Sequence, residues 1–332
     1  MNSYDAIVVT HGVCTDGSAA AWVVREYLTR QFKEQGIDTL PNIRYVFGMK
    51  RDLEKDLSST AWKDSLGIDH PALTIDDLEG KDIWILDYMY KIEEIKRIKY
   101  RTLTIIDHHS SNKEVIEECK YLNMGIDNAV RIFFEEKYSA AGLAWRLLMK
   151  DGENSIPWWI KYIEDRDLFT FSLPHSREVN DALFNLKYRN FNKFDELQSF
   201  TDEQRERFIE QGIIIGNIKK DIIDKIVRNA HPCIFDGYKI YVVETGTLVS
   251  EVGEALYTTY KNTCDFVMCI YYDFKERSFR CRLRCDKNSS LDLSEIAKKY
   301  SSEVGKGGGH KAAAAFNYIG NIFSLLEEIP QE

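Results

Sequence analysis

The stretch RTLTIIDHH, residues 101–109, sets an aspartate and two histidines directly after a run of β-branched and other apolar residues. A run of this length and composition is typical of a buried strand. The chain has only seven histidines in 332 residues, so two neighbouring ones at a strand end call for an explanation. Buried imidazoles beside a carboxylate need protons, polar partners or a metal ion, because unpaired polar groups in an apolar setting are strongly destabilising.

Two other segments of the N-terminal half repeat this pattern of an apolar run followed by a polar residue. DAIVVTHG (5–12) leads to His11, and KDIWILDYMY (81–90) contains Asp87 at the end of its apolar run. The carboxyl ends of parallel strands meet at one edge of a sheet, where polar site residues gather. We therefore expect His11, Asp87 and the 107–109 triplet to converge on one crevice.

Helix-like segments separate these runs. Residues 18–32 carry apolar side chains at the spacing of one helix face, and KIEEIKRIKY (91–100) reads as a basic amphipathic helix. Alternating strands and helices favour a parallel sheet with crossover helices. The sequence thus predicts an α/β fold whose first domain is a parallel sheet with helices on both faces.

The second half of the chain is organised differently. Helical segments are predicted at 139–150 and 157–169, and Thr201 with Gln204 forms a capping-box signature at the start of a long helix. Strand-like runs then follow at 233–244, 265–273 and 278–285, with a helix at 292–300 and a glycine loop at 305–316. We expect a catalytic domain at 1–200, a connecting helix at 201–230 and a smaller α/β domain at 231–332.

Composition excludes several classes of protein. The chain is 44% hydrophobic and 29% charged, which is ordinary for a globular protein. It contains no apolar run of membrane-spanning length and no signal-type N-terminus, and its seven scattered cysteines suit a reducing compartment, so a cytoplasmic protein with no membrane partner is expected. The net charge of −9 argues against a grip on long nucleic acid. Clustered carboxylates for metal binding would produce an acidic excess, although a solvated acidic surface explains it equally well.

The segment THGVCTDGSAAAW (10–22) adds further polar residues to the expected crevice. His11 and Asp16 flank a loop that glycines allow to turn sharply, although Asp16 alone could be a helix cap. Together with Asp87 and the 107–109 triplet, these residues supply carboxylates and imidazoles without a thiolate cage. Such a set suits Mn²⁺, Mg²⁺ or Fe²⁺ better than structural zinc.

Five motifs in order resemble the DHH phosphoesterase superfamily, in the group with a DHH-associated C-terminal domain. This group includes nanoRNases, RecJ-like exonucleases, cyclic-dinucleotide phosphodiesterases and exopolyphosphatase-like enzymes. The motifs, which cover nearly the whole chain, are HGVCTDG (11–17), ILD (85–87), DHH (107–109), YIEDRDLF (162–169) and GGGHKAAAAF (307–316).

The resemblance implies two divalent metal ions, with Mn²⁺ expected and Mg²⁺, Co²⁺ or Fe²⁺ as alternatives. Asp87 would bridge the two metals, and the implied ligands are His11, Asp16, Asp87, His108 and Asp165. Asp165 is preferred over Asp167 because D-x-x-x-F matches the fourth motif best, while an exposed helix face is the alternative reading. His109 would lie beside the reacting phosphate, and Asp107 would orient the histidines.

The resemblance also implies a substrate site in the C-terminal domain. Backbone N–H groups of Gly307, Gly308 and Gly309 would contact a phosphate whose charge His310 and Arg284 hold, and a flexible turn is the alternative for the glycines. The RCRLRC run (280–285) independently places its three arginines on one strand face and its two cysteines on the other, core-facing side.

Two positions depart from the family pattern. Cys14 and Ser18 stand near where many members have a second aspartate, and Ala315 stands where the C-terminal signature usually has glycine. Cys14 could be a soft ligand, a thiol behind the ligands, or merely packed beneath the site. Hard ions prefer oxygen and nitrogen donors, which favours a place beside the metals without an essential role.

These features together predict a metal-dependent phosphodiesterase that uses a water activated by two metals. The expected substrates are short oligoribonucleotides or linear dinucleotides, cut to mononucleotides. An exopolyphosphatase, a cyclic-nucleotide phosphodiesterase and a catalytically weak nucleotide sensor are the alternatives. A homodimer is left open.

Overall fold

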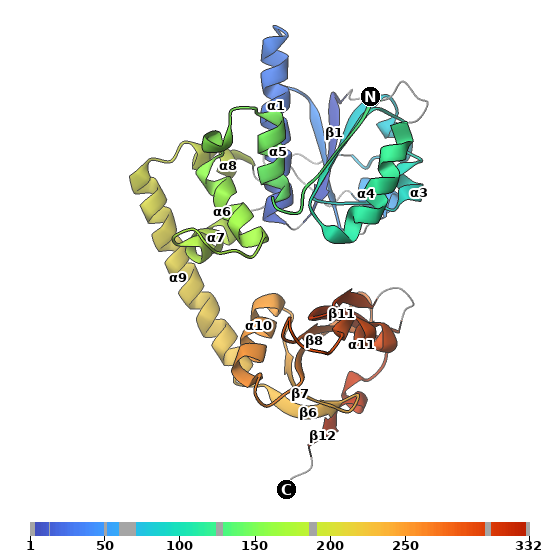
Figure 1. The fold of residues 1–332 in the computed structure, drawn as a ribbon, viewed down its shortest axis with the longest axis vertical. Helices are drawn as coiled ribbons and strands as arrows, with labels where there is room; N and C mark the ends of the chain where they lie inside the picture. The colour runs from blue at the N-terminus through green and yellow to red at the C-terminus, as the bar shows by residue number, and fades with distance from the viewer. Residues whose placement is uncertain are drawn as a thin grey trace. The chain divides into compact units, whose positions relative to one another are not determined.

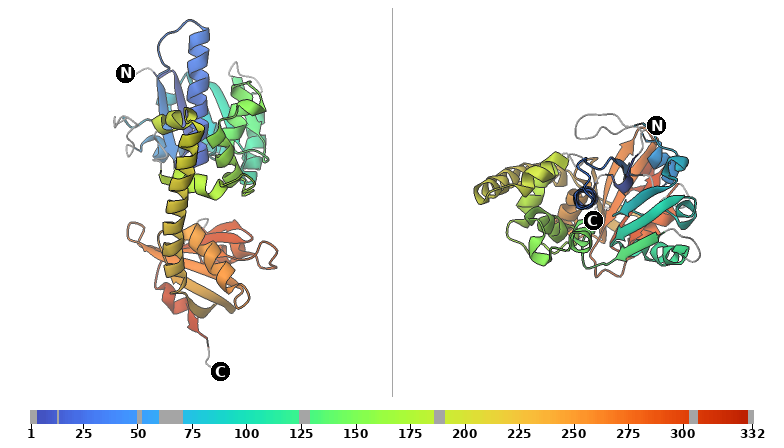
Figure 2. Two further views of the ribbon diagram at one scale, coloured as in Figure 1. Left: turned by 90° about the vertical axis from the view of Figure 1, so that its left-hand side faces the viewer. Right: turned by 90° about the horizontal axis from the view of Figure 1, so that it is seen from above.

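The computed structural model describes residues 4–12, 14–49, 52–59, 71–123, 129–185, 191–302 and 307–329 (Figure 1). The chain divides into two compact units, Met1–Gly216 and Asn217–Glu332. The division falls within the long helix α9 (Asp202–Val227), which is drawn in yellow in Figure 2. The expected capping box opens this helix: Thr201 N donates to Gln204 Oε1 at 2.8 Å, and Gln204 N donates to Thr201 Oγ1 at 3.3 Å.

The first unit is built on a five-stranded parallel sheet with the order β2-β1-β3-β4-β5. Its strands are β1 (Ala6–His11), β2 (Ile43–Gly48), β3 (Lys81–Leu86), β4 (Tyr100–Asp107) and β5 (Ala129–Phe134). The register aligns Val9 of β1 with Ile85 of β3, and Ile85 with Ile105 of β4, so the carboxyl ends of these strands lie at one edge. The predicted parallel sheet is confirmed.

Both faces of this sheet are covered, because successive side chains of a strand point to opposite sides. Ala6 and Val8 belong to one buried cluster, whereas Ile7 and Val9 belong to the other. The first cluster is packed by α1 (Thr15–Glu34), α5 (Ala140–Leu148), α6 (Trp158–Asp167), α7 (Ser176–Asn185) and α8 (Phe191–Gln198). The second is packed by α2 (Leu53–Leu57), α3 (Ile92–Ile95) and α4 (Lys113–Lys120). Figure 1 shows α1 and α5 on one side of the sheet and α3 and α4 on the other.

Two local expectations about this unit need correction. The helix expected at 91–100 is the single turn α3 (Ile92–Ile95), since strand β4 already begins at Tyr100. Strands β2 and β5 were not predicted, although β2 carries the buried apolar residues Ile43, Val46 and Phe47. Neither strand ends in the site residues that drew attention to the other three.

The second unit contains a seven-stranded mixed sheet with the order β10-β11-β9-β8-β7-β6-β12. Its strands are β6 (His231–Phe235), β7 (Tyr238–Glu244), β8 (Phe266–Asp273), β9 (Ser278–Arg284), β10 (Gly308–His310), β11 (Ala313–Tyr318) and β12 (Glu327–Glu328). Helix α11 (Leu293–Tyr300) packs on one face of this sheet, and α10 (Val249–Tyr260) packs on the other over β7 and β8. The smaller second α/β domain is confirmed.

Two turns in this unit refine the predicted strands. The run expected at 233–244 is a hairpin, because Asp236 and Gly237 have φ values of 53° and 79° and separate β6 from β7. The glycine segment is also a hairpin, since β10 pairs antiparallel with β11. In the part of the chain that the structure describes, no helix combines the length and apolarity that crossing a membrane requires.

Candidate metal centre

Three strand ends converge at the carboxyl edge of the parallel sheet. His11 closes β1, Asp87 directly follows β3, and Asp107 closes β4 and is followed by His108. The chain leaves β1 on one side of the sheet and β3 on the other, so the strand order reverses between them. A reversal of this kind opens a crevice in which open α/β sheets bind their ligands.

Asp87 and His108 lie at the middle of the cluster. His108 Nε2 is 3.3 Å from Asp87 Oδ1, and His11 Nδ1 is 3.8 Å from Asp87 Oδ2. Both oxygens of Asp87 and Nε2 of His108 are buried without a hydrogen-bond partner. Unsatisfied buried polar atoms are rare and strongly destabilising, so this arrangement calls for a bound cation.

The ligand atoms fall into three overlapping groups, in each of which they lie within 4.8 Å of one another. The groups are His11 with Cys14 and Asp87, Asp87 with His108 and His109, and Asp16 with His108 and Asp167. Asp87 and His108 each belong to two groups and link the whole set. A cluster of this extent has donors for more than one ion.

Asp16 lies in helix α1, but its carboxylate caps the N-terminus of helix α5. Its Oδ2 accepts a hydrogen bond from Ala140 N at 2.7 Å, and its Oδ1 accepts one from Ala141 N at 3.0 Å. These N–H groups open α5, whose N-terminus favours a carboxylate. Asp16 also lies 4.0 Å from His108 Nε2, so it takes part in the cluster while it fixes α5. The reading of Asp16 as a cap of its own helix is therefore replaced.

Asp167, rather than Asp165, reaches the cluster. Asp167 Oδ2 is 3.2 Å from His108 Nε2. Asp165 instead organises the loop after α6, because its carboxylate accepts hydrogen bonds from Thr170 Oγ1 at 2.6 Å, Ser172 N at 2.8 Å and Leu173 N at 3.1 Å. The geometry thus replaces the sequence-based preference for Asp165 with Asp167.

Asp107 is fully buried and holds the segment that follows β4. Its carboxylate accepts hydrogen bonds from His108 N at 2.7 Å, from His109 N at 3.1 Å and from Asn112 Nδ2 at 2.6 Å. His109 Nδ1 is 2.8 Å from the same carboxylate. An acceptor at this distance favours the proton on Nδ1 and leaves Nε2 of the half-exposed His109 ring for other partners.

The electrostatics of the cluster favour a cation. Burial opposes ionisation of Asp87, yet the imidazoles of His108 and His11 hold its pKa at about 2. Burial lowers the pKa of His108, but the carboxylates of Asp87, Asp16 and Asp167 raise it to about 9. Burial and neighbouring carboxylates raise the pKa of Asp16 and of Asp167. The carboxylates therefore repel one another, and divalent cations would relieve this repulsion.

The backbone conformation at Asp87 and the glycine at position 17 allow the start of α1 to lie close to the Asp87 carboxylate. Asp87 has a φ of 54°, in the left-handed region that non-glycine residues seldom adopt. A Cβ atom added at Gly17 would lie 2.7 Å from Thr10 Oγ1 and 3.0 Å from Asp87 Oδ2. Glycine at position 17 consequently leaves room beside the Asp87 carboxylate.

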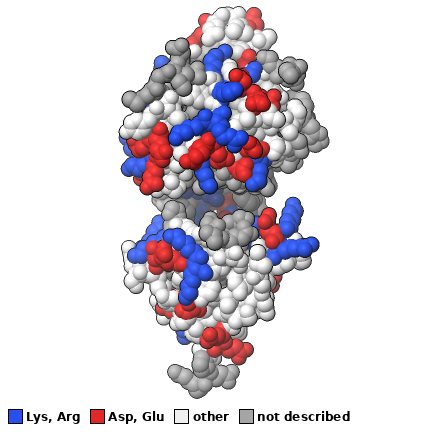
Figure 3. All heavy atoms as spheres, turned by 90° about the vertical axis from the view of Figure 1, so that its right-hand side faces the viewer, with Lys and Arg blue, Asp and Glu red and all other residues white. Residues whose placement is uncertain are grey.

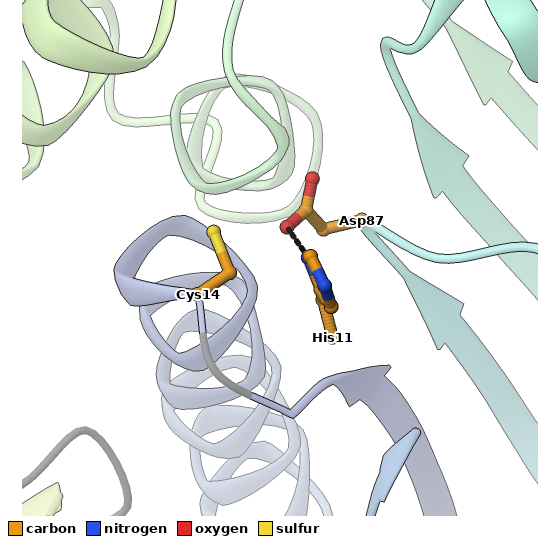
Figure 4. Close-up of side chains that lie close together, drawn as sticks. All are labelled: His11, Cys14 and Asp87. Carbon is orange, nitrogen blue, oxygen red and sulfur yellow. Dashed lines mark ion pairs between the residues drawn. The ribbon is translucent and has the colours of Figure 1, made fainter. Parts of the chain in front are cut away.

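Cys14 belongs to the same corner of the site. It precedes α1, and Figure 4 shows its sulfur beside the carboxylate of Asp87, with His11 coming from the end of β1. Burial, followed by the charges of Asp87, Asp16 and Asp167, raises the pKa of the Cys14 thiol well above its usual value. All seven cysteines are free, as the sequence predicts.

Sequence reasoning missed two residues that support the site. The Tyr88 ring stacks on His11 with ring centroids 5.8 Å apart, and its hydroxyl donates to the buried Asp56 at 3.0 Å. Asn112 donates to Asp107. The only sequence signal for these residues is their position: Tyr88 follows Asp87 directly, and Asn112 lies five residues after Asp107.

The predicted substrate residues of the second unit lie along one sheet face. The register pairs Arg284 with Ala313, and Ala313 with His310, so these positions form a row across β9, β11 and β10. The His310 side chain lies outside the part of the structure that is described. Arg284 is half-buried, burial lowers its pKa, and no carboxylate of the described residues lies within ion-pairing distance of it.

The three glycines of this hairpin differ in what they contact. An added Cβ at Gly307 would lie 2.2 Å from Ala297 O, so packing accounts for this glycine. One at Gly309 would lie 2.5 Å from Ala313 O, and Gly309 also has a φ of 143°. Gly308 has a φ of 153° and open space on its Cβ side. Cys281 and Cys285 are buried in the core of this unit, as predicted.

Charges on the outer surface are mixed. On the face in Figure 3, basic side chains lie among acidic ones rather than forming one continuous basic surface. Among the surface ion pairs of the first unit are Arg101 with Asp82 at 2.7 Å and Lys120 with Glu117 at 2.6 Å. This distribution agrees with the net charge of −9 and offers no long track for a nucleic-acid backbone on that face.

Comparison with known proteins identifies the second unit by sequence. Residues 237–331 match the model of the DHHA1 domain. "Uncharacterized protein R106" of Acanthamoeba polyphaga mimivirus is 24% identical over 327 residues, which are 95% of this chain and 68% of R106.

Solved structures with this architecture include the DHH domain of PF0399, which is described as belonging to a family of ribosomal proteins. It has a TM-score of 0.58 at 12% identity, over 97% of this chain and 84% of that one. RecJ from Thermus thermophilus in complex with Mn²⁺ has a TM-score of 0.47 at 11% identity, over 94% and 49%. The pGpG-specific phosphodiesterase PggH from Vibrio cholerae has a TM-score of 0.45 at 12% identity, over 96% and 94%. The predicted combination of a DHH-type fold with a DHHA1 domain is thereby confirmed.

Proposed function

We propose that this chain, in which a DHH-type unit precedes a DHHA1 domain, is a divalent-metal-dependent phosphodiesterase. The observation that carries the proposal is the buried pair of Asp87 and His108, whose ligand atoms lack hydrogen-bond partners inside a cluster of carboxylates and imidazoles. The proposed substrates are short oligoribonucleotides or linear dinucleotides, hydrolysed to mononucleotides.

The donors of the cluster would divide between two ions, and Asp87, whose ligand atoms lie near those of both His11 and His108, is the residue that could serve both. One ion would be held by His11 and Asp87, and the other by Asp16, His108 and Asp167. Divalent ions bound in this way supply Lewis-acid polarisation of phosphoryl oxygens. Mn²⁺ is the proposed metal, because the centre combines hard carboxylates with imidazoles.

His109 is the proposed proton donor to the leaving oxygen. Its ring is 38% exposed, and Asp107 fixes the ring through Nδ1. The hydrogen bond to Asp107 raises the pKa of His109, the direction that suits a proton donor. Asp107 acts as a positioning residue, because its oxygens also hold the backbone of His108 and His109.

The arginine face of the second unit supports a phosphate-bearing substrate. Arg284 is a half-buried cation without an ion pair among the described residues, and the neighbouring β11 positions carry the small residues Ala313 and Ala315. A guanidinium in this setting suits a phosphate group, which it can bind through two parallel hydrogen bonds. An acidic chain with such a limited basic face favours a short substrate over a long polymer.

The test is a hydrolysis screen with the full chain. Protein stripped by a chelator is supplied with Mn²⁺, Mg²⁺ or Co²⁺ and given RNAs of two to five nucleotides, a linear dinucleotide, cyclic dinucleotides and polyphosphate. We expect metal-dependent release of mononucleotides from the short linear substrates. Preferred turnover of polyphosphate or of cyclic dinucleotides would replace the substrate assignment, and absence of metal-dependent turnover on every substrate would overturn the enzyme assignment.

A further inference from the structure

One of the three ligand groups contains a sulfur atom. The Cys14 Sγ lies within 4.8 Å of the ligand atoms of His11 and Asp87, whereas the other two groups offer only oxygen and nitrogen donors. Cys14 comes from the start of α1, His11 from the end of β1 and Asp87 from the segment after β3 (Figure 4). Three separate segments therefore bring three different donor types to one point.

A second observation points to a ligand at this position. Asp87 is 2% exposed, both its oxygens lack a hydrogen-bond partner, and Oδ2 is the oxygen nearer to His11. The carboxylate is therefore directed into the same corner as the sulfur, where His11 lies at ion-pairing distance but no hydrogen bond reaches either oxygen. An ion placed there would meet a carboxylate, an imidazole and a thiol.

We propose that Cys14 is a metal ligand, and that the His11–Cys14–Asp87 half of the centre prefers softer divalent ions, such as Zn²⁺, Fe²⁺ or Co²⁺, over Mg²⁺. The half formed by Asp16, His108 and Asp167 keeps a harder set of donors. The inference rests on the metal centre of the proposed function and adds a chemical difference between its two halves.

The chemistry of the donors accounts for this difference. On binding, the thiol gives its proton to water and the thiolate takes one coordination position of the ion, so the centre gains one negative charge, as it would from a carboxylate. Thiolate is the softer donor and selects softer ions. The location of Cys14 at the N-terminus of the 20-residue helix α1 favours the thiolate once a cation is present.

Cobalt provides a readout that is independent of catalysis. The chelator-treated full chain is titrated with Co²⁺ and followed by absorbance, because a cobalt–thiolate bond gives an intense near-ultraviolet charge-transfer band that oxygen and nitrogen ligands do not give. We expect the band in the wild type and in Cys119→Ser, a matched control at a buried cysteine of the opposite core. We expect Cys14→Ser to lose it while the weaker visible cobalt bands remain.

Affinity measurements complete the test. Competition titrations should show that Cys14→Ser binds Zn²⁺ at least about tenfold more weakly, an effect that even outer partners of a ligand reach. The Cys14→Asp variant, which introduces a hard anion, should shift the preference toward Mg²⁺. Circular dichroism and thermal unfolding establish that each variant is folded.

The outcomes separate the two proposals. The thiolate assignment would be overturned if the wild type showed the visible cobalt bands without the charge-transfer band. It would also be overturned if folded Cys14→Ser kept the charge-transfer band. Either result would leave the metal centre in place. If the wild type binds no Co²⁺, Zn²⁺ or Mn²⁺ at all, the metal centre fails together with the proposed function and this inference.

Discussion

The two units carry buried or half-buried groups of opposite charge at their candidate sites. In the first, the oxygens of Asp87 are buried at the edge of a parallel sheet and lack partners. In the second, Arg284 is a half-buried cation on a mixed sheet, beside the small residue Ala313. The buried anionic cluster suits a cation, whereas the half-buried guanidinium suits an anion.

The largest effect is expected at Asp87, which links two ligand groups. Asn keeps the shape of the side chain and tolerates the left-handed backbone at φ 54°, but it lacks the charge. Asp87→Asn should slow turnover at least about a thousandfold, more than the ten- to hundredfold that loss of an outer partner costs. Steady-state kinetics measure the loss.

Asp82→Asn is the matched control, because Asp82 lies on the same strand and pairs with Arg101, far from the strand end. Its activity should stay close to that of the wild type. Near-normal turnover by a folded preparation of Asp87→Asn, free of wild-type protein, would remove the metal centre from the first unit.

The next effect concerns Asp167, the acidic residue of α6 that lies beside His108. Asp167→Asn should weaken Mn²⁺ binding and slow turnover by about a hundredfold, since it removes an anionic donor from the cluster. Asp165→Asn should bind Mn²⁺ with wild-type affinity. Metal titrations of both variants decide between them, and the reverse ranking would restore Asp165 as the ligand.

The third prediction concerns Arg284, the half-buried cation of the second unit. Loss of a hydrogen bond to a charged group costs roughly 1.5–3 kcal/mol, so Arg284→Ala should slow dinucleotide cleavage by about ten- to a hundredfold. A small chromogenic phosphodiester, which lacks the second nucleotide, should be hydrolysed at a nearly unchanged rate. Arg280→Ala is the control, because Arg280 already pairs with Asp273 at 3.0 Å. Equal losses on both substrates would mean that Arg284 supports the fold.

The smallest effect is one of stability and follows from the hydrogen bonds that Asp165 accepts. Burial raises the pKa of Asp165, but hydroxyl and N–H donors around it hold the pKa well below its usual range. A depressed pKa in the folded state stabilises the protein above the unfolded value of about 3.9, and this stabilisation is lost as the pH falls. Asp165→Asn should therefore be less stable by about 1.5–3 kcal/mol near pH 7.

Urea unfolding at several pH values measures this difference, which should narrow below about pH 4. Asp77→Asn is a control for general loss of a surface carboxylate, because Asp77 caps only its own turn. A difference between Asp165→Asn and wild type that is constant from pH 7 to pH 3 would mean that ionisation of Asp165 contributes nothing to stability.

The sequence was informative wherever one local pattern decides the structure. An apolar run that ends in aspartate or histidine predicted β1, β3 and β4 and the edge where His11, Asp87 and His108 meet. Such runs are buried on both faces of a parallel sheet, so the polar residues that follow them gather at the carboxyl edge of the sheet.

Other features depend on packing that no local pattern encodes. Asp165 and Asp167 are two residues apart on one helix, so they point to nearly opposite sides, and only the docking of α6 determines which one meets His108. The partner of Asp16 at the start of α5 lies 124 residues away in the chain. The Asp236–Gly237 turn, in contrast, carries a recognised hairpin signal that could have divided the run at 233–244.

The bond from Asp16 to the N-terminus of α5 also links metal binding to folding. The candidate metal ligands come from segments around residues 11–16, 87, 108 and 167, and the N–H group that holds Asp16 comes from residue 140. The complete cluster therefore exists only when these segments of the first unit are folded together. An ion that binds the native state alone stabilises it by mass action, and each tenfold rise in free metal above the dissociation constant adds about 1.4 kcal/mol. The free metal concentration would then set the thermodynamic stability of the folded chain as well as the occupancy of the cluster.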